Sequence, residues 1–163
     1  MDLIVQKYGG SSLGAIEKIK SIAKNISTLK KKKSIVVIVS AMAGETDRLH
    51  KLTRDIADIP NGREYDQVIS TGEKVSAGLI AIALSEIGIK VISLDPSKLR
   101  LITNDLHSKA TIISVGTDKI KEYLKKGYVV VVPGFQGINS KDDITTLGRG
   151  GSDLTAVAIA SAL

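Results

Sequence analysis

Residues 35–44 read Ile-Val-Val-Ile-Val-Ser-Ala-Met-Ala-Gly, and this stretch decides the fold class. Its first five residues are all β-branched with no polar interruption, which is typical of a strand buried on both faces of a parallel sheet. Small residues and a glycine then mark the end of the strand. The run Val129–Val132 has the same character and predicts a second buried strand. A sheet of such strands needs helices on both of its faces, so the two runs favour an α/β sandwich.

Apolar residues at helical spacing occupy much of the sequence around these strands. We predict helices over residues 13–29, 49–59, 75–87, 119–126 and 154–163, and further strands over residues 3–6, 91–94 and 111–115. The motif Pro60-Asn61-Gly62 is expected to end the second helix. Strands that alternate with helices predict a three-layer αβα sandwich with a mainly parallel sheet. Because no strand follows the last helix, we expect residues 1–163 to be a truncated part of a larger domain.

The composition excludes several kinds of site. The chain of 163 residues has no cysteine, which excludes disulfides, thiol nucleophiles and thiolate metal ligands. Its two histidines argue against a zinc site. No window reaches about 20 uninterrupted apolar residues, so we expect a soluble, cytoplasmic protein with no membrane span. The net charge of +6 permits nucleic acid, an anionic membrane surface or phosphorylated small molecules as partners, and it does not choose among them.

The first glycine loop, Lys7-Tyr8-Gly9-Gly10-Ser11-Ser12, lies between the first predicted strand and the first predicted helix. Paired glycines allow backbone N–H groups to turn toward an anion, and the helix N-terminus and Lys7 add positive charge. The loop matches neither the lysine loop of P-loop nucleotidases nor the dinucleotide-binding fingerprint. The alternative interpretation is a tight turn in which Ser11 or Ser12 caps the helix.

Two more glycine loops occur later in the chain. The loop Gly134-Phe135-Gln136-Gly137 comes directly after a buried strand, and loops after parallel strands collect at the carboxyl edge of the sheet, where ligands bind. Residues 145–153 read Thr-Thr-Leu-Gly-Arg-Gly-Gly-Ser-Asp and place Arg149 among three glycines. A planar guanidinium in such a loop suits bidentate binding of a carboxylate or phosphate. Ser152 and Asp153 also fit as the N-cap and a first-turn acid of the last helix.

Several other polar residues have an ordinary structural explanation. Glu73, Thr46 and Asp47 each lie where they could cap a helix. His50 lies among basic residues of a predicted helix and is expected to face solvent. His107 lies in a polar stretch that we interpret as loop surface, with a place beside the functional site as the alternative.

Taken together, five motifs in this order resemble the aspartokinases of the amino-acid kinase fold. The motifs are Lys7-Tyr8-Gly9-Gly10-Ser11-Ser12, Val39-Ser40-Ala41-Met42, Ser70-Thr71-Gly72-Glu73, Gly134-Phe135-Gln136-Gly137 and Thr145–Asp153. The resemblance covers residues 5–163 and implies an enzyme that transfers a phosphoryl group from MgATP to the β-carboxylate of L-aspartate. The product would be 4-phospho-L-aspartate, in the first step toward lysine, threonine and methionine. The resemblance also implies a homo-oligomer, with neither nucleic acid nor a membrane as partner.

The resemblance assigns a role to each matching residue. It places at the ATP phosphates Lys7, Tyr8, Gly9, Gly10, Ser11 and Ser40. It places at L-aspartate Thr46, Glu73, Arg149, Gly150, Gly151 and Ser152, with Glu73 holding the ammonium group. The catalytic residues would be Lys7 and Asp153, of which Asp153 would organise Lys7 or the metal-bound phosphates. Mg²⁺ would be carried by ATP, with no direct protein ligand.

The implied chemistry agrees with the types of residue present. The nucleophile is a carboxylate of the substrate, which is ionised at neutral pH, so no activated serine, cysteine or histidine is needed. The protein has to position two anions and neutralise their charge. Members of the family continue with a segment for adenine and ribose and with regulatory ACT domains, which we expect to be absent from residues 1–163.

Two alternatives stay open. The first is an amino-acid kinase with a different acyl acceptor. The second is a non-catalytic fragment or a domain that binds anions or nucleic acid, which the net charge and the run Lys30–Lys33 suggest. A lysine run at a helix end is also explained as a solvated complement to the helix dipole. One phenylalanine and four tyrosines leave few rings for stacking on bases.

Overall fold

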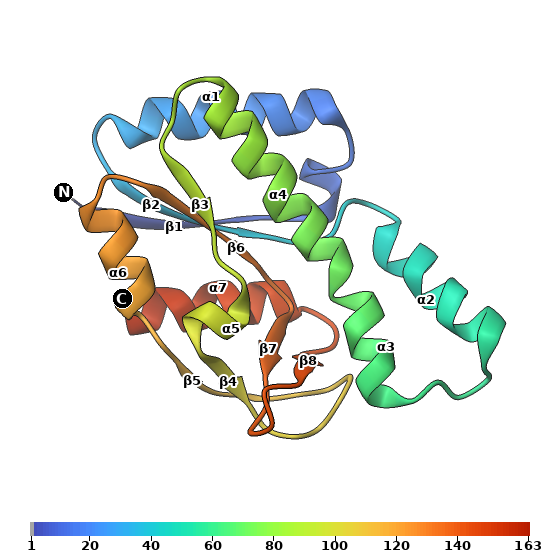
Figure 1. Ribbon diagram of the computed structural model, residues 1–163. Helices are drawn as coiled ribbons and strands as arrows, with labels where there is room; N and C mark the ends of the chain where they lie inside the picture. The colour runs from blue at the N-terminus through green and yellow to red at the C-terminus, as the bar shows by residue number, and fades with distance from the viewer. Residues whose placement is uncertain (1) are drawn as a thin grey trace.

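A parallel four-stranded sheet forms the centre of the molecule. The structure is a computed structural model that describes residues 2–163. The central sheet has the strand order β1–β2–β6–β3, and every pair in it is parallel (Figure 1). Its strands are β1 (Leu3–Tyr8), β2 (Ser34–Val39), β6 (Val129–Pro133) and β3 (Val91–Ser93). The two β-branched runs form the inner strands β2 and β6, as the sequence predicted.

Helices cover both faces of this sheet. The helices of the described residues are α1 (Ile16–Lys30), α2 (Glu45–Ile56), α3 (Gly62–Ile69), α4 (Thr71–Glu86), α5 (Pro96–Leu99), α6 (Asp118–Lys125) and α7 (Gly151–Ala162), with a short 3₁₀ helix at Gly10–Ser12. Helices α2 and α3 lie to one side of the sheet (Figure 1). Helices α1 and α4 lie on one face of the sheet, and α6 and α7 lie on the other (Figure 1). The predicted three-layer αβα sandwich is therefore confirmed.

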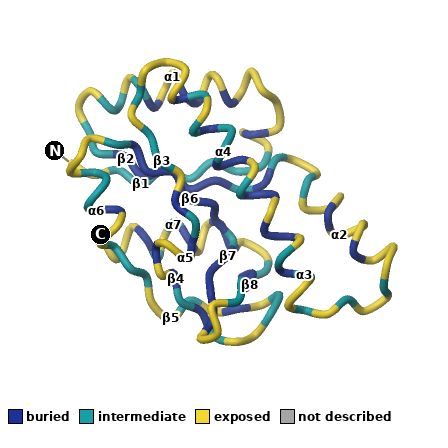
Figure 2. The backbone as a smooth tube through the Cα atoms, in the orientation of Figure 1, coloured by how far each residue is buried: buried dark blue, intermediate teal, exposed yellow. Residues whose placement is uncertain are grey.

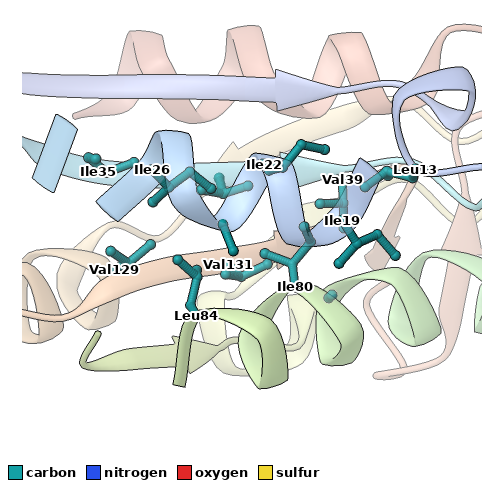
Figure 3. Packing of buried hydrophobic residues seen from close by; sticks show 13 residues of the cluster. Leu13, Ile19, Ile22, Ile26, Ile35, Val39, Ile80, Leu84, Val129 and Val131 are labelled. Atoms are coloured by element: carbon teal, nitrogen blue, oxygen red, sulfur yellow. The ribbon is translucent and has the colours of Figure 1, made fainter. Parts of the chain in front are cut away.

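The inner strands are buried on both faces because successive side chains point to opposite layers. The residues that pack with α1 and α4 are Ile35, Val37, Val39, Val129 and Val131 (Figure 3). The residues that pack with Ile120 of α6 and Ile159 of α7 are Val36, Ile38, Val130 and Val132. All of these strand residues are fully buried, so the sheet supplies the centre of both hydrophobic layers.

The layer between α1, α4 and the sheet carries a stability prediction. Ile80 of α4 is fully buried and lies beside Val131 (Figure 3). We expect Ile80→Ala to lower the free energy of unfolding by about 2–5 kcal/mol, because the truncated side chain leaves a cavity. The matched control is Ile82→Ala in the same helix, where the residue is 67% exposed. Chemical denaturation measures both variants, and equal losses would contradict this packing.

A second sheet of four short strands was not predicted as a unit. Its order is β5 (Ile112–Val115), β4 (Leu101–Thr103), β7 (Gln136–Ile138) and β8 (Ile144–Thr146). The pair β4–β7 is parallel, and the pairs β4–β5 and β7–β8 are antiparallel. The predicted strand at 111–115 exists, but it belongs to this mixed sheet. The other three strands have three residues each, which is too short to show any periodicity in the sequence.

Helix α3 was also missed by the sequence analysis. The side-chain oxygen of Asn61 accepts a hydrogen bond from the backbone N–H of Arg63 at 3.0 Å and so caps the new helix. The prediction that Pro60-Asn61-Gly62 ends the second helix was wrong, because α2 already ends at Ile56 and the motif begins the next helix. Its glycine is the first residue of α3.

Residues 62–86, which contain α3 and α4, are long and apolar enough to cross a membrane by length and composition alone. Of the most apolar window in this stretch, 44% is buried inside the fold. Figure 2 shows buried and exposed residues interleaved along α4, as expected of a helix that packs by one face. Core helices of folded domains pass the same test, and we interpret α4 as a core helix of the sandwich.

Candidate functional site

A cleft of about 630 Å³ opens at the carboxyl edge of the central sheet. Loops that follow β1, β2 and β6 meet there because all parallel strands end at the same edge. Of the residues assigned by resemblance, the cleft is lined by Lys7, Gly10, Ser40, Thr46, Glu73, Arg149, Gly150, Gly151, Ser152 and Asp153. The fold thus brings most of the predicted site residues to one place.

Lys7 and Asp153 form an ion pair in this cleft. The Lys7 Nζ atom lies 2.9 Å from Oδ1 of Asp153, which belongs to the first turn of α7. A Cβ atom on Gly9 would lie 3.4 Å from the same nitrogen, so the glycine backbone passes close to the lysine head. The Asp153 side chain is 69% exposed, and such an exposed ion pair is weakly held. The ammonium of Lys7 is therefore available to an incoming phosphate.

The glycine loop after β1 is shaped by its close approach to the loop after β2. A Cβ atom on Gly10 would come within 2.9 Å of the carbonyl oxygen of Ala41, so this position accepts only glycine without a backbone shift. Ser11 and Ser12 form a 3₁₀ turn, and α1 begins at Ile16 without any side-chain cap. The interpretation of these serines as helix caps was wrong.

Three residues assigned to the phosphates lie outside the cleft lining. Tyr8 is half-buried and packs against the hydrophobic core beneath α1. Gly9 lies next to the ammonium of Lys7. Ser11 is exposed, and its carbonyl oxygen accepts a hydrogen bond from Nζ of Lys18 at 2.9 Å. Contacts of these residues with ATP phosphates stay a prediction.

The loop that carries Arg149 is bent by two glycines in the left-handed region. Gly148 and Gly150 have φ values of +77° and +74°, a conformation that other residues rarely adopt. Gly150 is the N-cap of α7, and Ser152 makes no capping hydrogen bond, so the interpretation of Ser152 as N-cap was wrong. Arg149 is exposed, and in residues 2–163 no carboxylate lies within ion-pair distance of its guanidinium. The guanidinium is therefore available to bind an anion.

Glu73 extends from α4 to the loop after β2. Its Oε1 atom accepts a hydrogen bond from the backbone N–H of Ala41 at 3.0 Å, which bridges two elements and rules out the predicted helix-capping role. Gly72 makes this approach possible, because a Cβ there would lie 2.8 Å from the Ala41 side chain. The Glu73 residue is 4% exposed, and its second oxygen, Oε2, has no partner among the described residues.

The surroundings of Glu73 perturb its carboxyl group and leave one oxygen without a hydrogen-bond partner among the described residues. Burial raises the pKa of Glu73 to about 7, and the hydrogen bond from Ala41 offsets part of this effect. An unpaired buried carboxylate oxygen is unfavourable unless a donor from a ligand pairs with it. An ammonium group that enters the cleft would supply both the positive charge and the donors.

Thr46 and Ser40 lie on the loop and helix that follow β2. Thr46 is the second residue of α2, whose N-cap is Gly44 with φ of +78°, so neither Thr46 nor Asp47 caps this helix. Thr46, Asp47 and Ser40 line the cleft. These side chains are thus exposed to whatever the cleft binds.

Other residues of the cleft received no role in the sequence analysis, although Phe135 and Thr146 lie in two of its motifs. Tyr65, Ser108, Phe135 and Thr146 all line it. Phe135 has φ of +72°, and a bulky residue in the left-handed region is a strained conformation of the kind found at functional sites. Its place in the motif Gly134-Phe135-Gln136-Gly137 was the only signal in the sequence.

The two histidines differ in their surroundings. His50 is exposed, as predicted, and its Nδ1 lies 3.1 Å from the hydroxyl of Tyr65. His107 is partly buried and its Nδ1 lies 2.9 Å from Oδ2 of the fully buried Asp66, so its interpretation as loop surface was wrong. Its neighbour Ser108 lines the cleft. The alternative, a place beside the site, is the one that the geometry supports.

Other features suggested by the sequence lie apart from the cleft. The run Lys30–Lys33 precedes β2 and so lies at the amino edge of the sheet, away from the cleft at the carboxyl edge. Within residues 2–163, no group of three His, Asp or Glu side chains could hold a metal ion.

Comparison with known proteins gives consistent matches. The sequence profile of the amino acid kinase family matches residues 2–163. The chain is 46% identical to the aspartate kinase of Stutzerimonas stutzeri and 46% identical to the aspartokinase of Geobacillus stearothermophilus. Each alignment covers 100% of this chain and 40% of the relative, so the chain spans about two-fifths of the length of these relatives.

Solved structures of aspartate kinases have the same fold. The aspartate kinase from Synechocystis matches with a TM-score of 0.81 at 43% identity, over 99% of this chain and 26% of that chain. Aspartokinase III of E. coli in complex with aspartate and ADP matches with a TM-score of 0.82 at 23% identity, over 99% of this chain and 47% of that chain. The arrangement of elements around the cleft is therefore shared with these proteins.

Proposed function

Because the chain belongs to the amino acid kinase family, we propose that its cleft holds L-aspartate and the phosphates of MgATP for phosphoryl transfer to the side-chain carboxylate. The observation that carries this proposal is the unpaired, buried Oε2 of Glu73 in the same cleft as Arg149 and Lys7. A carboxylate, a guanidinium and an ammonium in one cleft match an acceptor that carries both an ammonium and carboxylates beside a phosphorylated donor.

The acceptor side is formed by Glu73 and Arg149. Glu73 would pair with the ammonium group of L-aspartate, and Arg149 would bind a carboxylate in the bidentate manner of a guanidinium. Thr46 and Ser152 line the same cleft and offer hydroxyl groups to the remaining oxygens. The identity of the acceptor is supported by relatives named aspartate kinases and by the E. coli protein solved with aspartate and ADP.

The phosphate side is formed by Lys7 and the loops that follow β1 and β2. The ion pair between Lys7 and the exposed Asp153 is weak enough for the Lys7 ammonium to bind a phosphate instead. Asp153 would then keep the Lys7 side chain in its orientation. Gly10 and Ser40 line the cleft beside it, and this donor set fits a polyphosphate. Mg²⁺ bound to ATP would supply further charge neutralisation to the transferred phosphoryl group. The acceptor carboxylate is already ionised, so the protein needs no general base.

The wider role follows from the same proposal. The product would be 4-phospho-L-aspartate, formed in the first step toward lysine, threonine and methionine, by a cytoplasmic homo-oligomer. Residues 1–163 would be the amino-acid-binding part of the kinase domain, with adenine and ribose held by other parts of the protein. The relatives are about two and a half times as long as this chain, which leaves room for such parts.

The raised pKa of Glu73 predicts that the binding of aspartate depends on pH. Since its pKa is about 7 in the free protein, and pairing with an ammonium requires the carboxylate, binding of aspartate at about pH 6.5 should release a proton. The affinity for aspartate should rise as the pH increases through 7. Glu73→Gln should weaken aspartate binding about tenfold or more and abolish the proton release. Isothermal titration calorimetry in buffers of different ionisation enthalpy measures both quantities.

The raised pKa of Glu73 also affects the stability of the folded protein, which should fall as the pH rises, whereas the affinity for aspartate should increase. The raised pKa means that the folded protein keeps a proton that the unfolded chain loses between pH 4.5 and about pH 7, so this part of the stability is lost as the pH rises through that window. Glu73→Gln should remove this loss and look more stable, relative to wild type, at about pH 8 than at about pH 5. A melting temperature that falls equally at both pH values would instead indicate a purely structural residue.

A further inference from the structure

Asp66 of α3 is a fully buried carboxylate that the proposed chemistry does not use. Its Oδ2 atom accepts hydrogen bonds from the backbone N–H groups of Ser108 and Thr146 at 3.0 and 3.1 Å. Its Oδ1 atom accepts a hydrogen bond from the hydroxyl of Thr146 at 2.7 Å, and Nδ1 of His107 lies 2.9 Å from Oδ2. A buried carboxylate is tolerated when its oxygens are satisfied in this way.

The donors to Asp66 belong to the wall of the cleft. Ser108 and Thr146 line the cleft, whereas Asp66 lies behind them and does not. Ser108 has φ of +66°, a left-handed conformation that costs a serine about 1 kcal/mol or more and persists only where its surroundings hold it. The hydrogen bond from Ser108 N–H to Asp66 is one such restraint.

Both residues that donate backbone hydrogen bonds to Asp66 also adjoin the loop that carries Arg149. Thr146 ends β8 and leads into that loop. A Cβ atom on Gly148 would lie 3.3 Å from the carbonyl oxygen of Ser108, so the Ser108 backbone lies directly against the loop. Asp66 therefore restrains both segments at once.

The helix that carries Asp66 also leads to Glu73. Helix α3 passes into α4 at Ser70, whose carbonyl oxygen accepts a hydrogen bond from the side-chain amide of Gln136 at 2.9 Å. Glu73 lies in the first turn of α4. Asp66 therefore connects the helices that lead to Glu73, the proposed ammonium site, with Ser108 and Thr146. These two residues lie against the loop of Arg149, the proposed carboxylate site.

We propose that Asp66 is a positioning residue of the acceptor site, which fixes Ser108 and the Arg149 loop relative to Glu73. This inference rests on the proposed function, because Glu73 and Arg149 are there proposed to hold the amino-acid acceptor. Asp66 would fix the distance between these two side chains. Asp66 is fully buried and does not line the cleft, so it would act through the residues that it holds. Its loss should disturb acceptor binding far more than ATP binding, since Lys7 is held by β1.

The kinetic test uses Asp66→Asn in the protein expressed from its complete gene. The backbone N–H of Ser108 lies 3.2 Å from Oδ1 and 3.0 Å from Oδ2 of Asp66, so the amide nitrogen of asparagine would face this donor in either orientation. We expect the KM for aspartate to rise about tenfold to a hundredfold, with the KM for ATP within about twofold of wild type. His107→Gln, outside the cleft, should raise the KM for aspartate in the same direction by a smaller factor.

The matched control is Asp95→Asn. Asp95 also accepts a backbone N–H, that of Ser97 at 3.1 Å, but it caps α5 and does not line the cleft. Both KM values should stay within about twofold of wild type in this variant. Equal rises of the two KM values in Asp66→Asn, or unchanged KM values with less folded enzyme, would reduce Asp66 to a structural residue and overturn the proposal.

Hydrogen exchange of the ligand-free protein provides a readout that needs no substrate. In Asp66→Asn, the amides of residues 106–110 and 146–151 should exchange faster, while those of β2 and β6 should not change. Unchanged exchange in the two segments would contradict the proposal. If Asp66→Asn does not fold, His107→Gln takes both measurements. A wild-type protein that leaves aspartate unphosphorylated would refute the proposed function, and the exchange result would still decide the role of Asp66.

Discussion

Lys7→Ala is expected to reduce turnover by about a hundredfold to a thousandfold, the loss seen when one donor to a developing negative charge is removed. The variant removes the ammonium that we place at the phosphates and leaves the carboxylate of Asp153, its partner at 2.9 Å, without compensation. Repulsion between that carboxylate and the phosphates should add to the loss. Steady-state kinetics with saturating aspartate and ATP measures the effect.

The control for this variant is Lys119→Ala. Lys119 of α6 forms an ion pair with Glu122 at 2.9 Å and does not line the cleft, so its removal takes away one charge and one ion pair far from the proposed site. Turnover of Lys119→Ala should stay close to that of wild type. Both variants should fold, because an exposed ion pair contributes about 0–1 kcal/mol. Near-normal turnover of Lys7→Ala would remove this lysine from the phosphate site.

Arg149→Ala is expected to raise the KM for aspartate about a hundredfold while the KM for ATP changes little. The guanidinium has no ion-pair partner within residues 2–163, so its proposed work is the binding of an acceptor carboxylate. Arg149→Lys should fall between wild type and alanine, because an ammonium cannot form the bidentate pair. Initial-rate measurements with each substrate varied in turn separate the two constants. Equal effects on both substrates would contradict the assigned role.

The parallel sheet was predictable because its strands carry their own signal. Ile35–Val39 and Val129–Val132 are continuous β-branched runs, and only the inner strands of a sheet covered on both faces need such runs. The second sheet left no such signal. Its strands β4, β7 and β8 have three residues each, and buried polar residues such as Gln136 and Thr145 occupy them.

Helix starts were the least predictable feature of the chain. The sequence offered Ser11, Thr46 and Ser152 as caps, but glycines or an alanine occupy the cap positions of these helices. Gly44 and Gly150 adopt left-handed conformations there, and the side chains that could have capped the helices lie elsewhere. The preference for Ser, Thr and Asp at N-caps therefore did not locate the starts of these helices, because the backbone turns sharply there and glycine or alanine takes the cap position.

The candidate site was predictable where its residues lie in contiguous motifs. Lys7, Glu73 and Arg149 each belong to a recognisable glycine-containing motif at the end of a strand or the start of a helix. Asp66 has no such motif. Its partners His107 and Thr146 lie 41 and 80 residues away in the sequence, so only the folded structure brings them together.

The central claim is that this cleft serves phosphoryl transfer to the side-chain carboxylate of L-aspartate. The most direct test incubates the protein from its complete gene with MgATP, aspartate and hydroxylamine, which traps an acyl phosphate as a hydroxamate. We predict hydroxamate in proportion to ADP with aspartate. With the methyl ester of its side-chain carboxylate, which reacts slowly with hydroxylamine on its own, we predict no ADP and no hydroxamate above a control without ATP. ADP formed without hydroxamate, or equal rates with the methyl ester, would contradict the account.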